Sequence, residues 1–169
     1  ALGAELATTS GLNMRVAVDA TVKSTTTFNV LADTPGGRTD RTVVVGAHLD
    51  SVAEGPGIND NGSGSSAILE TALQMAELGI EPTNRVRFAF WGAEEIGLIG
   101  STQYVAQLVA SGEIANVAAN LNFDMLGSPN FVRFVYDGDG SAFGLVGPTK
   151  GDISSAEIER VFVEFLAHK

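Results

Sequence analysis

The feature that most constrains the fold of this chain is a continuous apolar run from Thr42 to Ala47, with the sequence Thr-Val-Val-Val-Gly-Ala. Strands that have one face in water alternate apolar and polar residues, whereas strands of a parallel sheet are covered on both faces and are apolar throughout. The run therefore predicts a strand that is buried on both faces, inside a sheet with helices on either side.

Further strands and helices are predicted from apolar periodicity and from breaks at glycine and proline. Polar residues 38–41 are interpreted as a turn, and Gly79 as a C-cap before Pro82. Ser154 and Glu157 form a capping box for the last helix. Strands are expected over 14–22, 27–32, 42–47, 85–91, 117–123 and 130–136, and helices over 65–78, 99–111 and 154–168, with residues 1–10 ending a further helix that Gly11 closes. This order predicts the α/β class, a three-layer αβα sandwich with a mixed, mostly parallel central sheet.

Composition narrows the classes of function. The chain has 169 residues, of which 44 % are hydrophobic, so it suits one domain with a core. Its net charge of -10 argues against a nucleic-acid partner, which needs a basic surface. The absence of cysteine excludes thiolate metal sites and a cysteine nucleophile. No apolar run approaches the roughly 20 residues of a membrane span.

His48 leaves the buried run, and Asp50 follows two positions later. Side chains two apart in an extended segment point the same way, so Asp50 is a candidate to hold the second ring nitrogen of a metal-binding His48. The alternative is a structural histidine at a strand end, bonded to the backbone. Taken alone, this segment favours the structural histidine, because such histidines are common.

Carboxylates follow at three further places where α/β proteins build sites. Asp60 lies in a glycine-rich loop just before a predicted helix, where it is a candidate ligand or, alternatively, the N-cap. Glu94 and Glu95 follow the strand over 85–91, and their alternative is a solvated charged turn. Asp124 ends the strand over 117–123, a position where aspartate is often a turn residue. The sequence Asn61-Gly62-Ser63 also matches a glycosylation site, which we interpret as a chance match.

Together these residues offer one imidazole and several carboxylates. Zinc accepts both kinds of ligand, and cobalt suits them as well. Two divalent ions need a bridging carboxylate, for which Asp60 is the natural candidate. Glu94 is then available as a general base toward water. The residues therefore predict metal-assisted hydrolysis of an amide bond.

Four long motifs in order also resemble those of a known family. The chain is similar to the M28 zinc aminopeptidases, in particular the secreted bacterial type typified by the Streptomyces aminopeptidase. The motifs that carry the resemblance are Gly46-Ala47-His48-Leu49-Asp50-Ser51-Val52, Gly55-Pro56-Gly57-Ile58-Asn59-Asp60-Asn61-Gly62-Ser63-Gly64, Trp91-Gly92-Ala93-Glu94-Glu95-Ile96-Gly97-Leu98-Ile99-Gly100-Ser101 and Asn122-Phe123-Asp124-Met125-Leu126-Gly127-Ser128-Pro129-Asn130.

The resemblance implies a role for each residue. His48 and Asp124 would hold one zinc ion, Asp60 would bridge two zinc ions, and Glu95 would bind the second. Glu94 would be the general base, and Asp50 would orient His48. The implied reaction removes the N-terminal residue of a peptide or protein, often a large apolar one, and the implied location is outside the cell or in its envelope.

The chain also departs from the family. The family completes the second zinc site with a histidine far downstream, but the only other histidine here is His168, which suits a helix C-terminus. Residues 1–25 resemble the end of a protease-associated domain or its linker, and 26–169 an incomplete catalytic domain. We therefore expect two zinc ions in the family pattern, one of them short of a ligand, and a fragment that is weakly active or inactive alone.

Two other functional classes stay open at this point. Glutaminyl cyclases are acyltransferases that share the fold family, although the loop around Asp60 and the paired glutamates favour the peptidase. A binding module could keep the fold and lose the chemistry, although the predicted ligands and base are all present here. Carboxypeptidases of the M20 type are a more distant alternative with different motifs.

Overall fold

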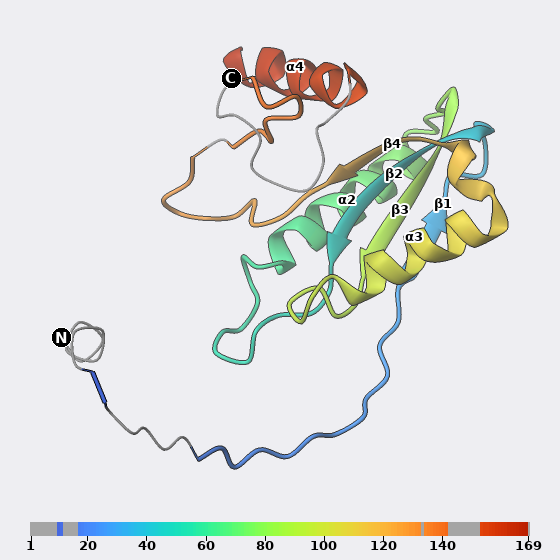
Figure 1. Ribbon diagram of the computed structural model, residues 1–169. Coiled ribbons are helices and arrows are strands. Elements are labelled where there is room, and N and C mark those ends of the chain that lie inside the picture. The colour runs from blue at the N-terminus through green and yellow to red at the C-terminus, as the bar shows by residue number, and fades with distance from the viewer. Residues whose placement is uncertain (1–9, 12–16, 133, 142–152, 169) are drawn as a thin grey trace.

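The computed structural model describes residues 10–11, 17–132, 134–141 and 153–168 (Figure 1). None of the helices in these residues is both long and apolar enough to cross a bilayer. In chain order the elements are β1 (Val30–Asp33), β2 (Arg38–His48), α2 (Gly62–Glu77), β3 (Asn84–Trp91), α3 (Ile99–Ser111), the 3-10 helix η1 (Glu113–Asn116), β4 (Val117–Asn122) and α4 (Ile153–Ala167).

The four strands form one open, mixed sheet in the order β1-β3-β2-β4. Strand β2 runs parallel to β3 on one side and to β4 on the other, while β1 is antiparallel to β3. In the centre of the sheet, Val44 is paired with Arg87 and with Asn120. The sheet confirms the predicted fold class, because the apolar run lies in its central strand and all the neighbours of that strand are parallel to it.

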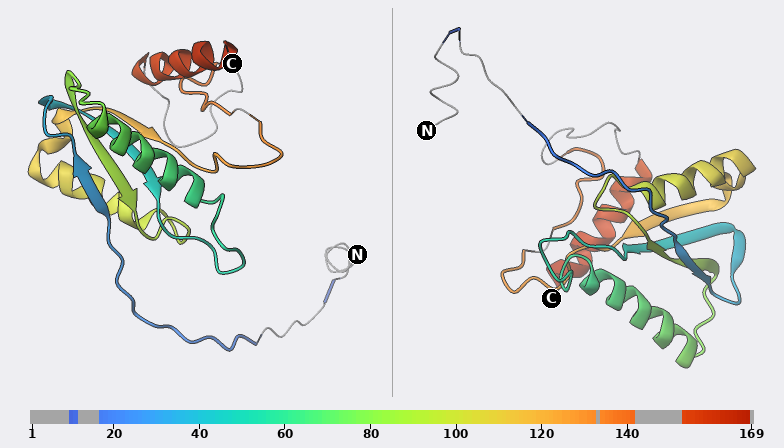
Figure 2. Two further views of the ribbon diagram at one scale, coloured as in Figure 1. Left: turned by 180° about the vertical axis from the view of Figure 1, so that it is seen from behind. Right: turned by 90° about the horizontal axis from the view of Figure 1, so that it is seen from below.

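Helices cover the two faces of the sheet, as Figure 2 shows for α2 and α3. On one face, Ile68 of α2 is buried against Ala47 and Phe88. On the other, Tyr104 and Leu108 of α3 are buried in a cluster with strand residues that include Val44. The core therefore forms on both sides of β2, which explains why the run from Thr42 to Ala47 contains no exposed residue.

Some predicted elements match the structure and others do not. Helix α3 has the predicted bounds, and Gly79 follows α2 with a φ of 62°, as a residue after a helix end often does. The turn over 38–41 is wrong, because these residues extend β2 and Arg38 pairs with Asn84. Polar residues are compatible with a strand here, since this end of β2 is exposed.

Two predicted strands are absent from the described residues. Residues 17–22 form neither helix nor strand and are exposed, and the described part of 130–136 has no strand either. A strand forms only when a neighbour accepts its backbone hydrogen bonds. Residues 1–9, 14–16 and the cap proposed at Ser154 lie outside the residues or side chains that the structure describes. The division of the chain into a linker or domain remnant over 1–25 and a catalytic domain over 26–169 stays a prediction.

Candidate functional site

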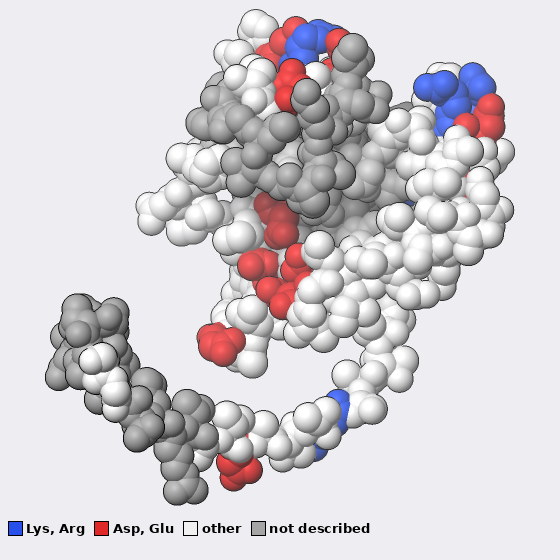
Figure 3. All heavy atoms as spheres, viewed as in Figure 1, with Lys and Arg blue, Asp and Glu red and all other residues white. Residues whose placement is uncertain are grey.

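The carboxyl ends of the parallel strands bring the predicted residues to one edge of the sheet. His48 is the last residue of β2, Glu94 follows β3, and Asp124 follows β4. Asp60 comes from the loop that leads into α2. Figure 3 shows acidic side chains gathered near this end of the strands, whereas lysine and arginine side chains lie mainly elsewhere on the visible face. The edge is therefore a strongly negative environment that favours cations.

His48 lies at the centre of the cluster and is only 2 % exposed. Its Nδ1 is 3.0 Å from the backbone carbonyl oxygen of Asp50. A carbonyl only accepts, so we assign the ring proton to Nδ1, which leaves Nε2 with a free lone pair. Nε2 lies 3.0 Å from Asp60 Oδ1, 3.4 Å from Asp124 Oδ2 and 3.8 Å from Glu94 Oε2. The alternative interpretation, a structural histidine bonded to the backbone, thus describes Nδ1 but not Nε2, which faces the carboxylates.

The Asp50 carboxylate is directed mainly toward the loop after β3. It accepts hydrogen bonds from the backbone N–H of Glu94 at 2.9 Å and of Glu95 at 3.2 Å. Its Oδ1 is 3.5 Å from His48 Nδ1, longer than a normal hydrogen bond. Burial opposes ionisation, yet these two amides hold the pKa of Asp50 below its ordinary value. Asp50 therefore connects the end of β2 to the loop with both glutamates. Its backbone carbonyl bonds to His48, and its carboxylate bonds to the backbone of Glu94 and Glu95.

Asp60 is not the N-cap of α2. The cap is Asn61, whose side chain accepts a hydrogen bond from the backbone N–H of Gly64 at 2.9 Å. Asn61 is also only 2 % exposed, so the glycosylation pattern that begins there is not accessible in the folded chain. With the helix capped by its neighbour, the Asp60 carboxylate is free to face His48.

The electrostatics of the cluster raise three pKa values. Burial raises the pKa of the Glu94 carboxyl, although the nearby His48 acts to lower this pKa. Burial likewise raises the pKa of Asp124, although His48 opposes the shift and Asp60 supports it. The pKa of His48 is also raised, because Asp124, Glu94 and Asp60 together outweigh its burial. Closely spaced carboxylates that resist ionisation in this way are relieved by a bound cation.

Two unsatisfied atoms test whether a metal fits this cluster. Among the described residues, His48 Nε2 and Glu95 Oε1 are buried side-chain atoms without any hydrogen bond. His48, Asp60 and Glu95 also offer ligand atoms that all lie within 4.8 Å of one another. A nitrogen lone pair that faces carboxylate oxygens is repelled unless a proton or a metal cation lies between them. One imidazole and several carboxylates are a donor set that zinc accepts, so the residues fit the metal.

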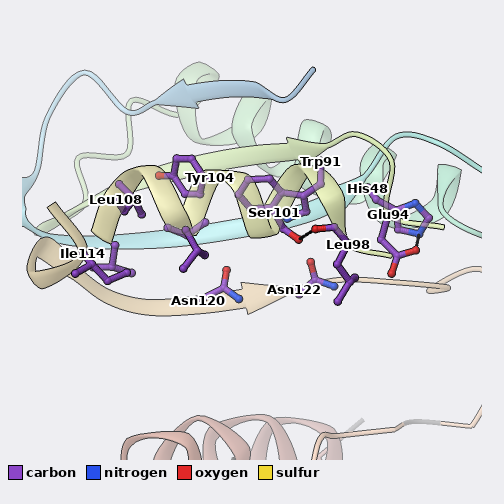
Figure 4. A pocket seen from close by; sticks show the side chains of 13 residues that line it. His48, Trp91, Glu94, Leu98, Ser101, Tyr104, Leu108, Ile114, Asn120 and Asn122 are labelled. Atoms are coloured by element: carbon purple, nitrogen blue, oxygen red, sulfur yellow. Dashed lines mark hydrogen bonds and ion pairs between the residues drawn. The ribbon is translucent and has the colours of Figure 1, made fainter. Parts of the chain in front are cut away.

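A pocket of about 310 Å³ adjoins the cluster. His48 and Glu94 lie at one end of it, as Figure 4 shows, and Leu98, Tyr104 and Leu108 line its wall along α3. Asn120 and Asn122 of β4 line the other side. The pocket places an apolar space directly beside two of the predicted site residues.

Other candidate ligands lie outside this cluster. His168 follows the last residue of α4, is exposed, and belongs to neither group of metal-compatible side chains among the described residues. The second such group consists of Asp137, Asp139 and Glu159. Two of its members accept from backbone, since Gly138 N–H donates to Glu159 and Ser141 N–H donates to Asp139. The second group contains no histidine, so only the first offers imidazole.

Sequence reasoning missed the polar residues that support the cluster. The Ser65 hydroxyl donates a 2.6 Å hydrogen bond to the carbonyl of His48, which ties α2 to the end of β2. Asn59 and Asn61, on either side of Asp60, bond to the segment around Asp124. The only available signal was the preference of asparagine for helix N-caps, which applies to Asn61.

Comparison with known proteins identifies the family and relatives of this chain. A model of peptidase family M28 matches residues 29–166. An aminopeptidase of Pseudomonas aeruginosa is 57 % identical over 154 residues, which cover 91 % of this chain and 27 % of that protein. Leucine aminopeptidase 2 of Trichophyton equinum is 47 % identical over 162 residues, which cover 96 % of this chain and 31 % of that protein. The chain therefore spans about a third or less of the length of these relatives.

A solved structure is similar as well. A zinc aminopeptidase from Bacillus subtilis superposes with a TM-score of 0.54 at 39 % sequence identity. The match covers 59 % of this chain and 24 % of that one. Sequence and structure comparisons thus indicate the same group of proteins.

Proposed function

The chain belongs to peptidase family M28, and from that premise we propose that it carries the metal site of an aminopeptidase, which removes residues from the N-terminus of peptides. The observation that carries the proposal is the surroundings of His48 Nε2. Three carboxylates lie within 3.8 Å of this buried atom, and no hydrogen bond satisfies it. The names of the relatives, aminopeptidase and zinc aminopeptidase, support the same activity.

In this proposal the ligands are divided between two zinc ions. His48 and Asp124 would hold one ion, Glu95 would hold the other, and Asp60 would be shared by both, as the close approach of these side chains supports. When bound, zinc supplies Lewis acidity toward the scissile carbonyl group and the attacking water. Asp50 positions both sides of the site, since its carbonyl holds His48 and its carboxylate holds the backbone of Glu94 and Glu95.

The proposed work of Glu94 is proton transfer. A carboxylate with a raised pKa is suited to take a proton from water near neutral pH and to deliver it to the leaving amine. Its Oε2 lies 3.8 Å from His48 Nε2, farther than the carboxylates of Asp60 and Asp124. Glu94 therefore reaches the proposed metal site, and we assign it to proton transfer and not to metal binding. The cationic amino group of a substrate would meet the negative charge of this edge. Export to the cell envelope or beyond is also a proposal, carried by the resemblance alone.

The test is a chimaera in which this chain replaces the matching region of the Pseudomonas aeruginosa aminopeptidase. We expect it to bind two zinc ions and to hydrolyse leucine p-nitroanilide. Glu94→Gln should lower kcat by at least about 100-fold while the zinc content is unchanged. Glu54→Gln is the matched control, because Glu54 is an exposed carboxylate of the loop after Asp50.

Two results would sink the proposal. One is a chimaera without zinc, as for a binding module. The other is full activity in the Glu94→Gln variant, which would remove the proposed base. Peptides with N-terminal glutamine add a further check, because ammonia release without shortening of the peptide would indicate a cyclase instead.

A further inference from the structure

Two asparagines flank Asp60, and each reaches across to the segment around Asp124. The Asn61 side chain donates from Nδ2 to the carbonyl of Phe123, the residue before Asp124, at 3.0 Å. The Asn59 side chain accepts at Oδ1 from the backbone N–H of Gly127, three residues after Asp124, at 2.9 Å. The two proposed metal ligands thus lie between two cross-links made by their own neighbours.

The Asn61 side chain is buried, and both its nitrogen and its oxygen make hydrogen bonds. The same side chain that donates to Phe123 accepts from Gly64 N–H at 2.9 Å. The amide supplies both groups, since its nitrogen donates and its oxygen accepts. Gly64 allows the close approach, because an added Cβ there would collide with Asn61 Oδ1 and with the carbonyl of Phe123. The first turn of α2 is therefore held directly against the end of β4.

The Asn59 cross-link is fixed by the same turn of helix. The Ser63 hydroxyl donates to the carbonyl of Asn59 at 2.6 Å and lies 3.3 Å from its Oδ1. Gly127 approaches closely, since its added Cβ would lie 3.1 Å from the Cβ of Ser63. The loop after Asp124 is thus attached to the loop before α2 at a second point.

We propose that Asn59 and Asn61 are positioning residues that set the separation between the Asp60 and Asp124 carboxylates. Both carboxylates lie within 3.4 Å of His48 Nε2, so a small shift of either backbone would change the space left for a cation. A metal site needs its ligands held within about 0.5 Å of their working geometry. This inference rests on the proposed zinc site, because it concerns the distance between two of the proposed zinc ligands, Asp60 and Asp124.

Asn61→Ser separates positioning from capping. Serine caps a helix about as well as asparagine, so the bond to Gly64 N–H can be replaced, but its short side chain has no amide to reach Phe123. The variant carries no new charge that would itself attract a cation. Asn59→Ala removes the other cross-link and leaves the cap intact.

The experiment measures zinc affinity of the full chain by competition with a chelating dye, under conditions where circular dichroism shows each variant to be folded. Loss of a residue that supports a ligand typically weakens metal binding by about 10- to 100-fold. We expect that loss for Asn61→Ser and a smaller one for Asn59→Ala. Asp33→Asn is the control, since it breaks a hydrogen-bonded pair between β1 and β3 away from the cluster.

The outcomes are distinguishable. Weaker zinc binding in Asn61→Ser than in Asp33→Asn, at equal folded fraction, supports positioning. Zinc affinity equal to that of the unaltered chain would overturn it and leave Asn61 as a helix cap alone. If the unaltered chain itself binds no zinc, the proposed function has failed first, and the inference fails with it.

Discussion

Gly46, two residues before the end of β2, lies directly against the Trp91 side chain. A Cβ added at Gly46 would lie 2.5 Å from Trp91 Nε1 and 3.2 Å from Asn122 Oδ1. The indole also stacks at a tilt of 43° on Tyr104, with ring centroids 5.2 Å apart, so it has little freedom to move aside. The glycine is therefore required by close approach in a strand where β-branched residues are otherwise favoured.

At the residue scale, we predict that Gly46→Ala lowers the free energy of unfolding by about 2 kcal/mol, because overpacking forces Trp91 to shift. Urea unfolding followed by tryptophan fluorescence measures the change. Gly36→Ala is the matched control, since nothing lies within 4 Å of its added Cβ, and it should change stability by less than about 0.5 kcal/mol. Equal destabilisation by the two substitutions would refute the argument.

The helices contribute to the fold through few buried side chains. In α2, Ile68 is 2 % exposed, whereas its neighbour Leu69 is 50 % exposed. Ile68 is the residue of α2 that is buried in the cluster with Ala47 and Phe88, and partly buried residues, among them Ala72 and Met75 of the same helix, pack against this cluster. Because the first turn of α2 also carries the loop with Asp60, the packing of Ile68 holds one proposed ligand in place.

At the element scale, we predict that Ile68→Ala costs about 3 kcal/mol of unfolding free energy through lost burial and the cavity left behind. Leu69→Ala should cost less than about 1 kcal/mol, since half of that side chain is already in water. Thermal and urea denaturation of both variants give the comparison. A similar loss in both would mean that α2 is held by something other than this face.

Strand β1 is fixed to β3 by an ion pair that gives stability a pH dependence. Arg87 donates to both oxygens of Asp33, each at 2.6 Å, and its third nitrogen donates to Tyr104. This hydrogen-bonded guanidinium holds the pKa of Asp33 below its ordinary value despite partial burial. A carboxyl whose pKa is lower in the folded chain stabilises it above the unfolded pKa of about 3.9.

We therefore predict that Asp33→Asn lowers stability by about 1–2 kcal/mol near neutral pH. The difference from the unaltered chain should shrink as the pH falls from about 4 toward the folded pKa, because the native carboxylate is then protonated as well. Urea unfolding at a series of pH values measures this difference. If the difference in unfolding free energy between the two chains stayed constant at all pH values below about 4, the ion pair would not be the cause of the pH dependence.

The elements that were predictable are those with a local cause. Helix α3 was predicted at its bounds, Ile99 to Ser111, because apolar periodicity fills the space between two glycine-containing segments. The strand predicted over 14–22 is absent from its described part, residues 17–22, because alternation says nothing about whether a neighbouring strand exists. The gathering of the candidate residues at one edge of the sheet was predictable because most of them directly follow strand ends. Asn59 and Asn61 were not, since their partners lie 68 and 62 residues away.

The whole molecule assembles its proposed metal site from four separate segments. These segments are the end of β2, the loop before α2, the loop after β3 and the end of β4. Contacts between the sheet strands are what bring the four together, since β2 lies between β3 and β4. A metal bound by all four would therefore bind the folded chain and not the unfolded one, which links metal binding to global stability.

We predict that zinc at 100 times its dissociation constant raises the free energy of unfolding by about 2.7 kcal/mol, and that a chelator reverses the gain. Calorimetric melting with and without zinc measures the effect. His48→Ala should abolish it, while His168→Ala should leave it unchanged, because His168 is exposed at the end of α4. Loss of the zinc effect in both variants would place the metal elsewhere.

The position of β4 has a consequence for the order of folding. Asp124 follows a strand that pairs with β2 on the side opposite β3, so it reaches His48 only when β4 has docked in register. Parallel pairing between distant segments is slow, because the entropy of loop closure is lost before any contact forms. Zinc would then bind tightly only to chains whose last parallel strand is in place. Metal uptake during refolding should accordingly follow sheet formation and report its completion, with the lag between the two measuring how late β4 docks.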